Sequence, residues 1–167
     1  MGKSPILLKA DGSRADSQIL LATRQGTAVE NNQCWSLPFY DQQLAEEHRK
    51  KCMPPKAIYR CGPSPVYNCH GLTFASRRTR IWTDNAIKLI LTEDNYAIVE
   101  KEFVLPGDIV VYYNAGDAEH SGIVVEAQSP MSIRVVSKFG SGNELVHWLY
   151  DVAPYDTSDI KFYRIRT

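Results

Sequence analysis

A cysteine and a histidine, separated by 51 positions, are the residues best suited to chemistry in this sequence. Cys69 precedes a short run in which Leu72 and Ala75 recur at helical spacing. A cysteine at the start of a helix meets unpaired backbone N–H groups and the positive end of the helix dipole. That environment favours the thiolate, which is the nucleophilic form. His120 begins a β-branched run and is the candidate base for this thiolate.

A thiolate beside an imidazole can carry out acyl transfer from an amide. The backbone N–H of Cys69, at the helix start, would help to hold the oxyanion, and His120 would protonate the leaving amine. Tyr67 precedes the cysteine by two positions and is expected to line the cleft. His70 lies about 100° around the helix from Cys69, so its side chain should point away from the thiol and contact substrate.

The other cysteines do not suggest a metal site. Cys34, Cys52, Cys61 and Cys69 are separated by 18, 9 and 8 positions, whereas structural zinc sites use pairs of ligands only a few residues apart. The even number permits two disulfides, but neither the length nor the composition demands them. We therefore expect neither a metal nor a cofactor.

Composition indicates one soluble globular domain. The chain has 167 residues, of which 44% are hydrophobic and 23% charged, and 19 basic residues balance 19 acidic ones. A neutral balance argues against nucleic-acid binding and against a polybasic membrane surface. No apolar run has the length of a transmembrane helix, and none at the start resembles a signal peptide. We expect a monomer that is cytoplasmic or is exported without a cleavable signal.

Helices are expected before strands along the chain. Asp41 is a plausible cap for a surface helix over residues 42–51, the helix of Cys69 should end near residue 78, and Thr83 or Asp84 should begin a third helix. After residue 95 the apolar period changes to two. This change predicts strands over residues 96–99, 109–113, 120–126, 132–138 and 160–166, with a strand or helical turn over 145–150. The order predicts an α+β domain with helices packed on one face of an antiparallel sheet of four or more strands.

Three blocks, at residues 68–73, 105–113 and 120–125, carry a resemblance to a known family. They read Asn-Cys-His-Gly-Leu-Thr, Leu-Pro-Gly-Asp-Ile-Val-Val-Tyr-Tyr and His-Ser-Gly-Ile-Val-Val. In type and order they resemble the nucleophile motif, the Pro-Gly-Asp strand and the His-x-Gly strand of the NlpC/P60 cysteine peptidases. The resemblance covers about residues 60–140. Asn68 and His70 stand where that family usually has Asp and Ser.

The resemblance implies a minimal papain-like fold, with the cysteine helix packed against a small sheet that carries the histidine. Residues 1–167 would form one such domain, with 60–167 as the catalytic core and 1–59 as an extension packed on it. The family has a third polar residue on the strand after the histidine strand. A hairpin at residues 128–130 would bring residues 136–139 beside His120, which makes Ser137 the expected acceptor for the imidazole. Lys138 and His147 are the alternatives.

The expected function is that of a thiol hydrolase that cleaves an amide through Cys69 and His120. The resemblance implies a peptide substrate, most often the stem peptide of bacterial peptidoglycan, and leaves room for a secreted effector or for an enzyme that deamidates a protein. Transfer of the acyl group to an acceptor other than water is an alternative. Another is a non-catalytic binding or immunity module with a cognate protein partner.

Overall fold

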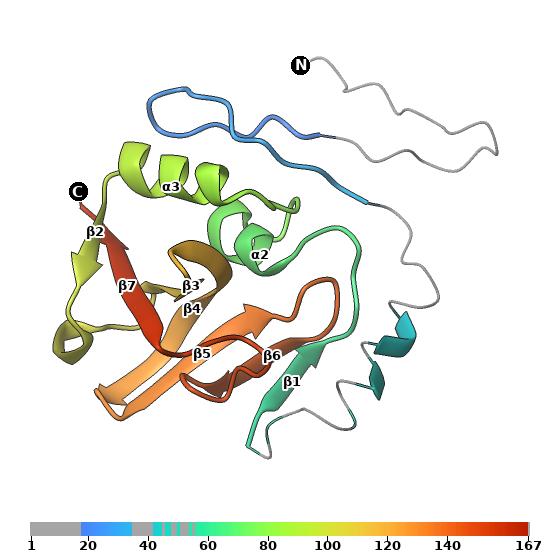
Figure 1. Ribbon diagram of the computed structural model, residues 1–167, viewed down its shortest axis with the longest axis vertical. Coiled ribbons are helices and arrows are strands. Elements are labelled where there is room, and N and C mark those ends of the chain that lie inside the picture. Colours follow the sequence, from blue (N-terminus) through green and yellow to red (C-terminus); the bar gives the residue numbers. More distant parts are fainter. Residues whose placement is uncertain are drawn as a thin grey trace.

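The computed structural model describes residues 18–34, 42–44, 46, 47, 50, 54 and 56–166. An antiparallel seven-stranded sheet is packed against the helices α2 (Cys69–Ala75) and α3 (Asp84–Glu93) (Figure 1). A short 3₁₀ helix, η1 (Lys101–Phe103), follows the second strand. The predicted α+β class is therefore confirmed.

The strands follow the order β1-β6-β5-β4-β3-β7-β2 across the sheet. Their bounds are β1 (Ile58–Cys61), β2 (Tyr96–Val99), β3 (Ile109–Asn114), β4 (Asp117–Ser129), β5 (Ser132–Lys138), β6 (Glu144–Trp148) and β7 (Asp159–Ile165). The ranges predicted for β2 and β5 are confirmed, and the segment near residue 145 is a strand. β4 begins three residues before His120, so this histidine lies within the strand rather than at its start. β1 was not predicted, because three of its four residues are exposed and it has no apolar alternation.

The two faces of the sheet are covered differently. α2 packs on β4 and β5, while α3 packs on β2 and β4, and Figure 1 shows both helices together on one side of the sheet. Beneath them lies a cluster formed by Ile109, Val111, Tyr113 and Tyr163. The intervening residues of β3, Val110 and Tyr112, belong to a separate cluster on the other face, which also contains Val104, Leu149 and Val152. Loop residues therefore close the face that the helices leave open.

Local capping explains where the helices begin and end. The side chain of Asn68 accepts a hydrogen bond from the backbone N–H of Gly71, and that of Thr83 accepts one from Ala86, so each is an N-cap. α2 ends at Ala75, three residues earlier than predicted, because Ser76 and Arg77 both take left-handed conformations with φ of 49° and 65°.

Part of the N-terminal segment packs on α3. Val29 shares a buried cluster with Ile81, Ile87 and Ile90, and the hydroxyl of Thr23 donates to Glu93 at 2.5 Å. Of the helix expected over residues 42–51, residues 42–44, 46, 47 and 50 are helical. Its proposed cap at residue 41, together with Cys52 and the first 17 residues, lies outside the described residues.

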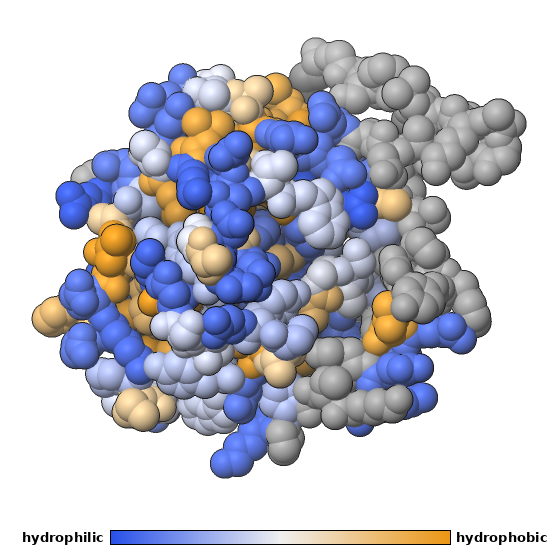
Figure 2. All heavy atoms as spheres, in the orientation of Figure 1, coloured by the Kyte–Doolittle hydropathy of each residue, from blue (hydrophilic) through white to orange (hydrophobic). Residues whose placement is uncertain are grey.

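The surface is predominantly hydrophilic on the face that Figure 2 shows, and apolar residues occur there in small separate groups. Within the described part of the chain, none of the helices combines the length and the apolar character needed to cross a bilayer.

Candidate active site

Cys69 occupies the first position of α2, directly after the capping residue. The amide oxygen of Asn68 accepts from the backbone N–H of Gly71 at 2.9 Å and of Ile81 at 3.1 Å, while its amide nitrogen donates to the Ile81 carbonyl at 2.7 Å. An aspartate carboxylate could accept but could not make this donated bond. Asn68 thus ties the start of α2 to the segment before α3, which fixes the backbone of the neighbouring cysteine.

The glycines of the two motifs are needed because other backbone approaches closely. A Cβ on Gly71 would lie 1.8 Å from the carbonyl oxygen of Thr79. A Cβ on Gly122 would lie 2.4 Å from a methyl of Val135 and 2.8 Å from the carbonyl oxygen of Val136. The first glycine lets α2 close against the segment that follows it, and the second lets β5 approach β4 two residues from His120.

Two histidines act on the thiol of Cys69, which is only 4% exposed. Burial by itself raises the pKa of this thiol, but the charge of His70 and then that of His120 oppose it, and the net pKa lies well below the usual value. The structure therefore brings the predicted pair together and adds His70 to it. The two histidines therefore favour the thiolate form of Cys69.

His70 does not point away from the nucleophile, contrary to the prediction. Its Nδ1 lies 2.8 Å from the hydroxyl of Ser121, and its Nε2 lies 3.2 Å from the carbonyl oxygen of Ala118. Burial lowers the pKa of His70, but the neighbouring Cys69 outweighs this effect and the net pKa is raised. The side chains of Cys69 and His70 leave the helix in directions about 100° apart. Both nevertheless reach residues of β4, which lies against α2.

His120 is fully buried and is enclosed by aromatic rings. Tyr155 stacks on it with ring centroids 4.0 Å apart and an interplanar angle of 14°, and Tyr112 and Phe139 lie at 5.5 and 5.4 Å. Neither ring nitrogen of His120 has a hydrogen-bond partner among the described residues. Its orientation therefore comes from aromatic packing, and its buried nitrogens, which act on the thiol of Cys69, are not committed to another side chain among the described residues.

The predicted contact between Ser137 and His120 is not made. The register that pairs Gly122 with Ser137 places Phe139, rather than the serine, beside His120. The hydroxyl of Ser137 instead lies 2.7 Å from Nε2 of His147, whose Nδ1 lies 2.8 Å from the carbonyl oxygen of Trp148.

Lys138, the other alternative, lies on the opposite face of β5 from Ser137 because successive residues of a strand alternate. Its ammonium donates to the carbonyl of Gly142 at 2.5 Å and lies over the ring of Tyr67 at 4.6 Å. Burial lowers the pKa of Lys138 to about 8. Neither Lys138 nor His147 bonds to His120. Among the described residues, no polar side chain therefore orients the imidazole of His120.

Tyr67 also differs from the prediction, because it does not line the cleft at Cys69. Its hydroxyl donates to the buried carboxylate of Glu144 at 2.9 Å and lies 3.4 Å from the sulfur of Cys61. Arg77 binds the same carboxylate through two bonds of 2.9 Å. Tyr67 thus belongs to a structural cluster that anchors the end of α2 to β6.

A cleft of about 580 Å³ opens at Cys69. His70 and Tyr155 contribute to its wall, as do Trp82 and three acidic residues, Asp84, Asp117 and Glu119. No sequence pattern links Tyr155 to this site, since it lies in the loop between β6 and β7. Ser121 lay inside the His-x-Gly block and was the only neighbour of His70 that the motif could have indicated.

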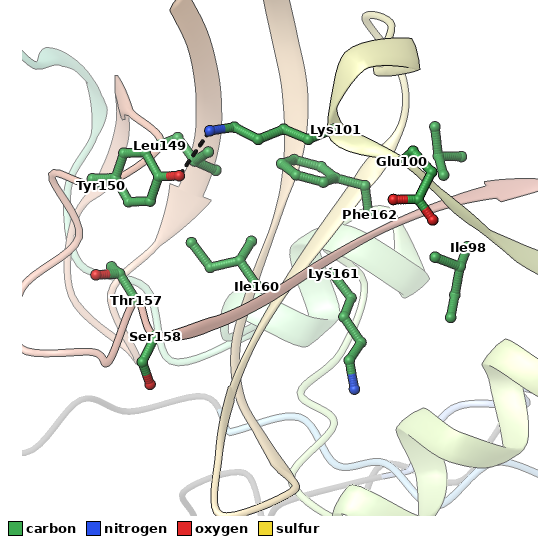
Figure 3. Close-up of a pocket in the computed structure, with 11 residues that line it drawn as sticks. Ile98, Glu100, Lys101, Leu149, Tyr150, Thr157, Ser158, Ile160, Lys161 and Phe162 are labelled. Atoms are coloured by element: carbon green, nitrogen blue, oxygen red, sulfur yellow. Dashed lines mark hydrogen bonds between the residues drawn. The ribbon is translucent and has the colours of Figure 1, made fainter. Parts of the chain in front are cut away.

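A second cavity, of about 350 Å³, shares no lining residue with this cleft. Figure 3 shows Lys101, Tyr150, Ser158 and Lys161 around it, and Lys101 donates to the hydroxyl of Tyr150 at 2.8 Å. Its lining contains neither a cysteine nor a histidine. Of these two cavities, the cleft at Cys69 is the one whose lining contains a cysteine and a histidine, Cys69 and His70.

Within the described ranges, no group of three or more His, Cys, Asp and Glu side chains is arranged to hold a metal ion. Comparisons of the chain with protein-family models, with curated proteins and with solved structures find no match. Function is therefore inferred from the geometry around Cys69.

Proposed function

We propose that this chain is a thiol hydrolase with a minimal papain-like fold that cleaves an amide bond in a peptide. Cys69 is the nucleophile and His120 carries the proton. The resemblance of the three sequence blocks to the NlpC/P60 peptidases makes the stem peptide of peptidoglycan the first substrate to test. An enzyme of this kind needs no cofactor.

The observation that supports this proposal is the position of Cys69, which lines a cleft at a helix start next to two histidines whose charges lower the pKa of its thiol. A buried structural cysteine in apolar surroundings would have a raised pKa. Perturbed thiols in clefts are typical of functional sites. The free ring nitrogens of His120 favour a group that moves a proton over one that only packs.

The reaction begins from a Cys69 thiolate whose proton is held by His120. The thiolate attacks the carbonyl carbon, a C–S bond forms, and the backbone N–H of Cys69 helps to hold the oxyanion. The C–N bond then breaks, and His120 gives its proton to the leaving amine. In the second half, His120 takes a proton from water and the hydroxide adds to the carbonyl carbon of the thioester. The C–S bond then breaks and the carboxylic acid leaves, which returns Cys69 to the thiolate and leaves His120 protonated.

Selective alkylation tests the nucleophile. The protein would be treated with iodoacetamide from about pH 5 to about pH 9 and the adducts mapped by mass spectrometry. We expect Cys69 to react faster than Cys34, Cys52 and Cys61, with the advantage largest at the acid end, and His120→Ala to slow it. Equal and slow labelling of all four cysteines would contradict the enzymatic proposal.

Digestion of purified peptidoglycan tests the substrate. Wild type should release new amino and carboxyl termini from the stem peptide, and Cys69→Ala should release none. Rapid alkylation of Cys69 without digestion would keep the hydrolase proposal and exclude this substrate. Protein amides would then be the next class to test.

A further inference from the structure

The hydrogen bonds around His70 determine how many protons its ring carries. The chain of bonds begins at the carbonyl oxygen of Cys69, which accepts from the hydroxyl of Thr73 at 2.9 Å. A carbonyl oxygen can only accept, so this bond uses the single hydroxyl proton of Thr73. The oxygen of Thr73 can then act only as an acceptor toward other groups.

The next link is Ser121, whose hydroxyl lies 3.0 Å from the oxygen of Thr73. Because Thr73 has no proton left, Ser121 must donate this bond, which uses its own single proton. Ser121 can then only accept from the Nδ1 of His70, 2.8 Å away. The Nδ1 of His70 must therefore carry a proton.

The other ring nitrogen is fixed in the same way. The Nε2 of His70 lies 3.2 Å from the carbonyl oxygen of Ala118, which can only accept. Both ring nitrogens thus carry protons, and a ring with two N–H groups is an imidazolium.

We infer that His70 is a resident imidazolium, held charged by the Ser121–Thr73 hydroxyl chain, and that it acts as a positioning residue which keeps Cys69 as a thiolate. The inference rests on the proposed role of Cys69 as a nucleophile. It divides the work of the two histidines. His70 cannot exchange its protons without breaking a bond at each nitrogen, whereas His120 has both nitrogens free to move the proton of the reaction.

Other charged groups face this pair from each neighbouring element. Asp84 of α3 acts on His70 and favours its charged form, and it also accepts from the backbone N–H of Ala118 at 3.0 Å. Glu119 lines the same cleft. The charge of His120 on β4 acts on Cys69. The charge of Cys69 in turn acts on Lys138 of β5 and on Tyr155 of the β6–β7 loop. A test must therefore change the hydroxyl chain without changing any of these charges.

Thr73 offers a matched pair of uncharged substitutions. Thr73→Val keeps the shape but removes the hydroxyl, so that Ser121 is free to donate to Nδ1 and to select a neutral imidazole. Thr73→Ser keeps the hydroxyl and should behave as wild type. The charge of His70 would be read from the ¹⁵N shifts of its ring across a pH titration, with His70→Gln used to assign the signals. The thiolate would be read from its ultraviolet absorbance and from the rate of alkylation of Cys69.

We expect both ring nitrogens of His70 to stay protonated at neutral pH in wild type and in Thr73→Ser. In Thr73→Val one nitrogen should lose its proton, and alkylation of Cys69 at the acid end of the pH range should slow by about tenfold, because a smaller fraction of Cys69 is then thiolate. A neutral His70 in wild type at pH 7 would overturn the inference, and this measurement needs no variant to fold. Thr73→Val alkylating like wild type would also overturn it. A charged His70 beside a thiolate that hydrolyses no amide would contradict the proposed function and leave the inference standing.

Discussion

The two histidines beside Cys69 have opposite surroundings. His70 lies on the helix, and both of its nitrogens are engaged, one by Ser121 and one by the Ala118 carbonyl. His120 lies on β4 among Tyr112, Phe139 and Tyr155, and neither of its nitrogens has a partner among the described residues. Both nevertheless lower the pKa of the same thiol.

This difference separates two tasks that a single histidine usually combines. A base that must take up and release a proton needs a nitrogen that is not already bonded, while a group that only supplies charge is best held by fixed acceptors. Ordinary catalytic histidines are oriented by a polar third residue. Here aromatic faces hold His120, and the polar contacts are gathered around His70.

The difference between the surroundings of His70 and His120 should be disturbed most by moving the helix that carries His70. Gly71→Ala would place a methyl 1.8 Å from the carbonyl oxygen of Thr79, which belongs to backbone and cannot turn aside. Overpacking of this kind costs about 3 kcal/mol or more where neighbouring backbone must shift. We expect the free energy of unfolding, measured with urea, to fall by at least this amount.

Gly62→Ala is the matched control for the glycine substitution. There the added methyl would meet, among the described residues, only the hydroxyl of Tyr59 at 3.0 Å, which is the far end of a side chain that can move. Its effect on the unfolding free energy should stay within about 1 kcal/mol. Equal effects of the two substitutions would show that the approach of α2 to Thr79 is not tight.

A third histidine sharpens the contrast because burial favours its neutral form. Nδ1 of His147 donates to the carbonyl of Trp148, and in the neutral ring Nε2 accepts from the hydroxyl of Ser137. Burial lowers the pKa of His147 to about 4, against about 6.5 in an unfolded chain. Between these values the unfolded chain binds a proton that the folded protein excludes. Stability is therefore lost as the pH falls from about 6.5 to about 4, by up to about 3 kcal/mol.

Urea unfolding of wild type and His147→Gln at several pH values measures the contribution of His147 to the free energy of unfolding. Carboxylates also titrate in this range, so the quantity of interest is the difference between the two slopes, and the variant should lose less stability on acidification. His70 should show the opposite sign, since its pKa is raised. Its contribution is fully present below about pH 6.5 and is lost as the pH rises through the raised value. Identical slopes for wild type and His147→Gln would mean that His147 is not held neutral.

Local patterns were sufficient to predict the helix starts, most strands and the Cys69–His120 proximity. Asn68 and Thr83 are caps whose side chains act within three residues, and the alternation of β3 depends on neighbours in sequence. The turn at residues 128–130 also predicts the pairing of β4 with β5. The register of that pairing places Phe139 beside His120.

The remainder of the site depended on contacts between distant elements. Tyr155 reaches His120 from a loop 35 positions later in the chain, and Ser137 turns to His147 on β6 because of the strand order. Rotation about the helix axis does not predict the position of His70, because its partners Ser121 and Ala118 lie on β4. The register of a sheet decides which side chains are neighbours across two strands. A difference of two residues along β5 is what places Phe139, and not Ser137, beside His120.

The smallest expected effect tests whether aromatic packing alone orients His120. Tyr155→Leu would remove the ring stacked at 4.0 Å, and such a contact is worth about 1 kcal/mol, which corresponds to a loss of roughly fivefold in turnover of a thioester or activated ester. Tyr155→Phe keeps the ring and should retain the wild-type rate, because its hydroxyl has no part in the stack. Alkylation of Cys69 should change little in either variant, since the charge of His70 is untouched. A large loss in Tyr155→Phe would point to the hydroxyl as the missing polar partner of the site, and the division between a polar and an aromatic histidine would then fail.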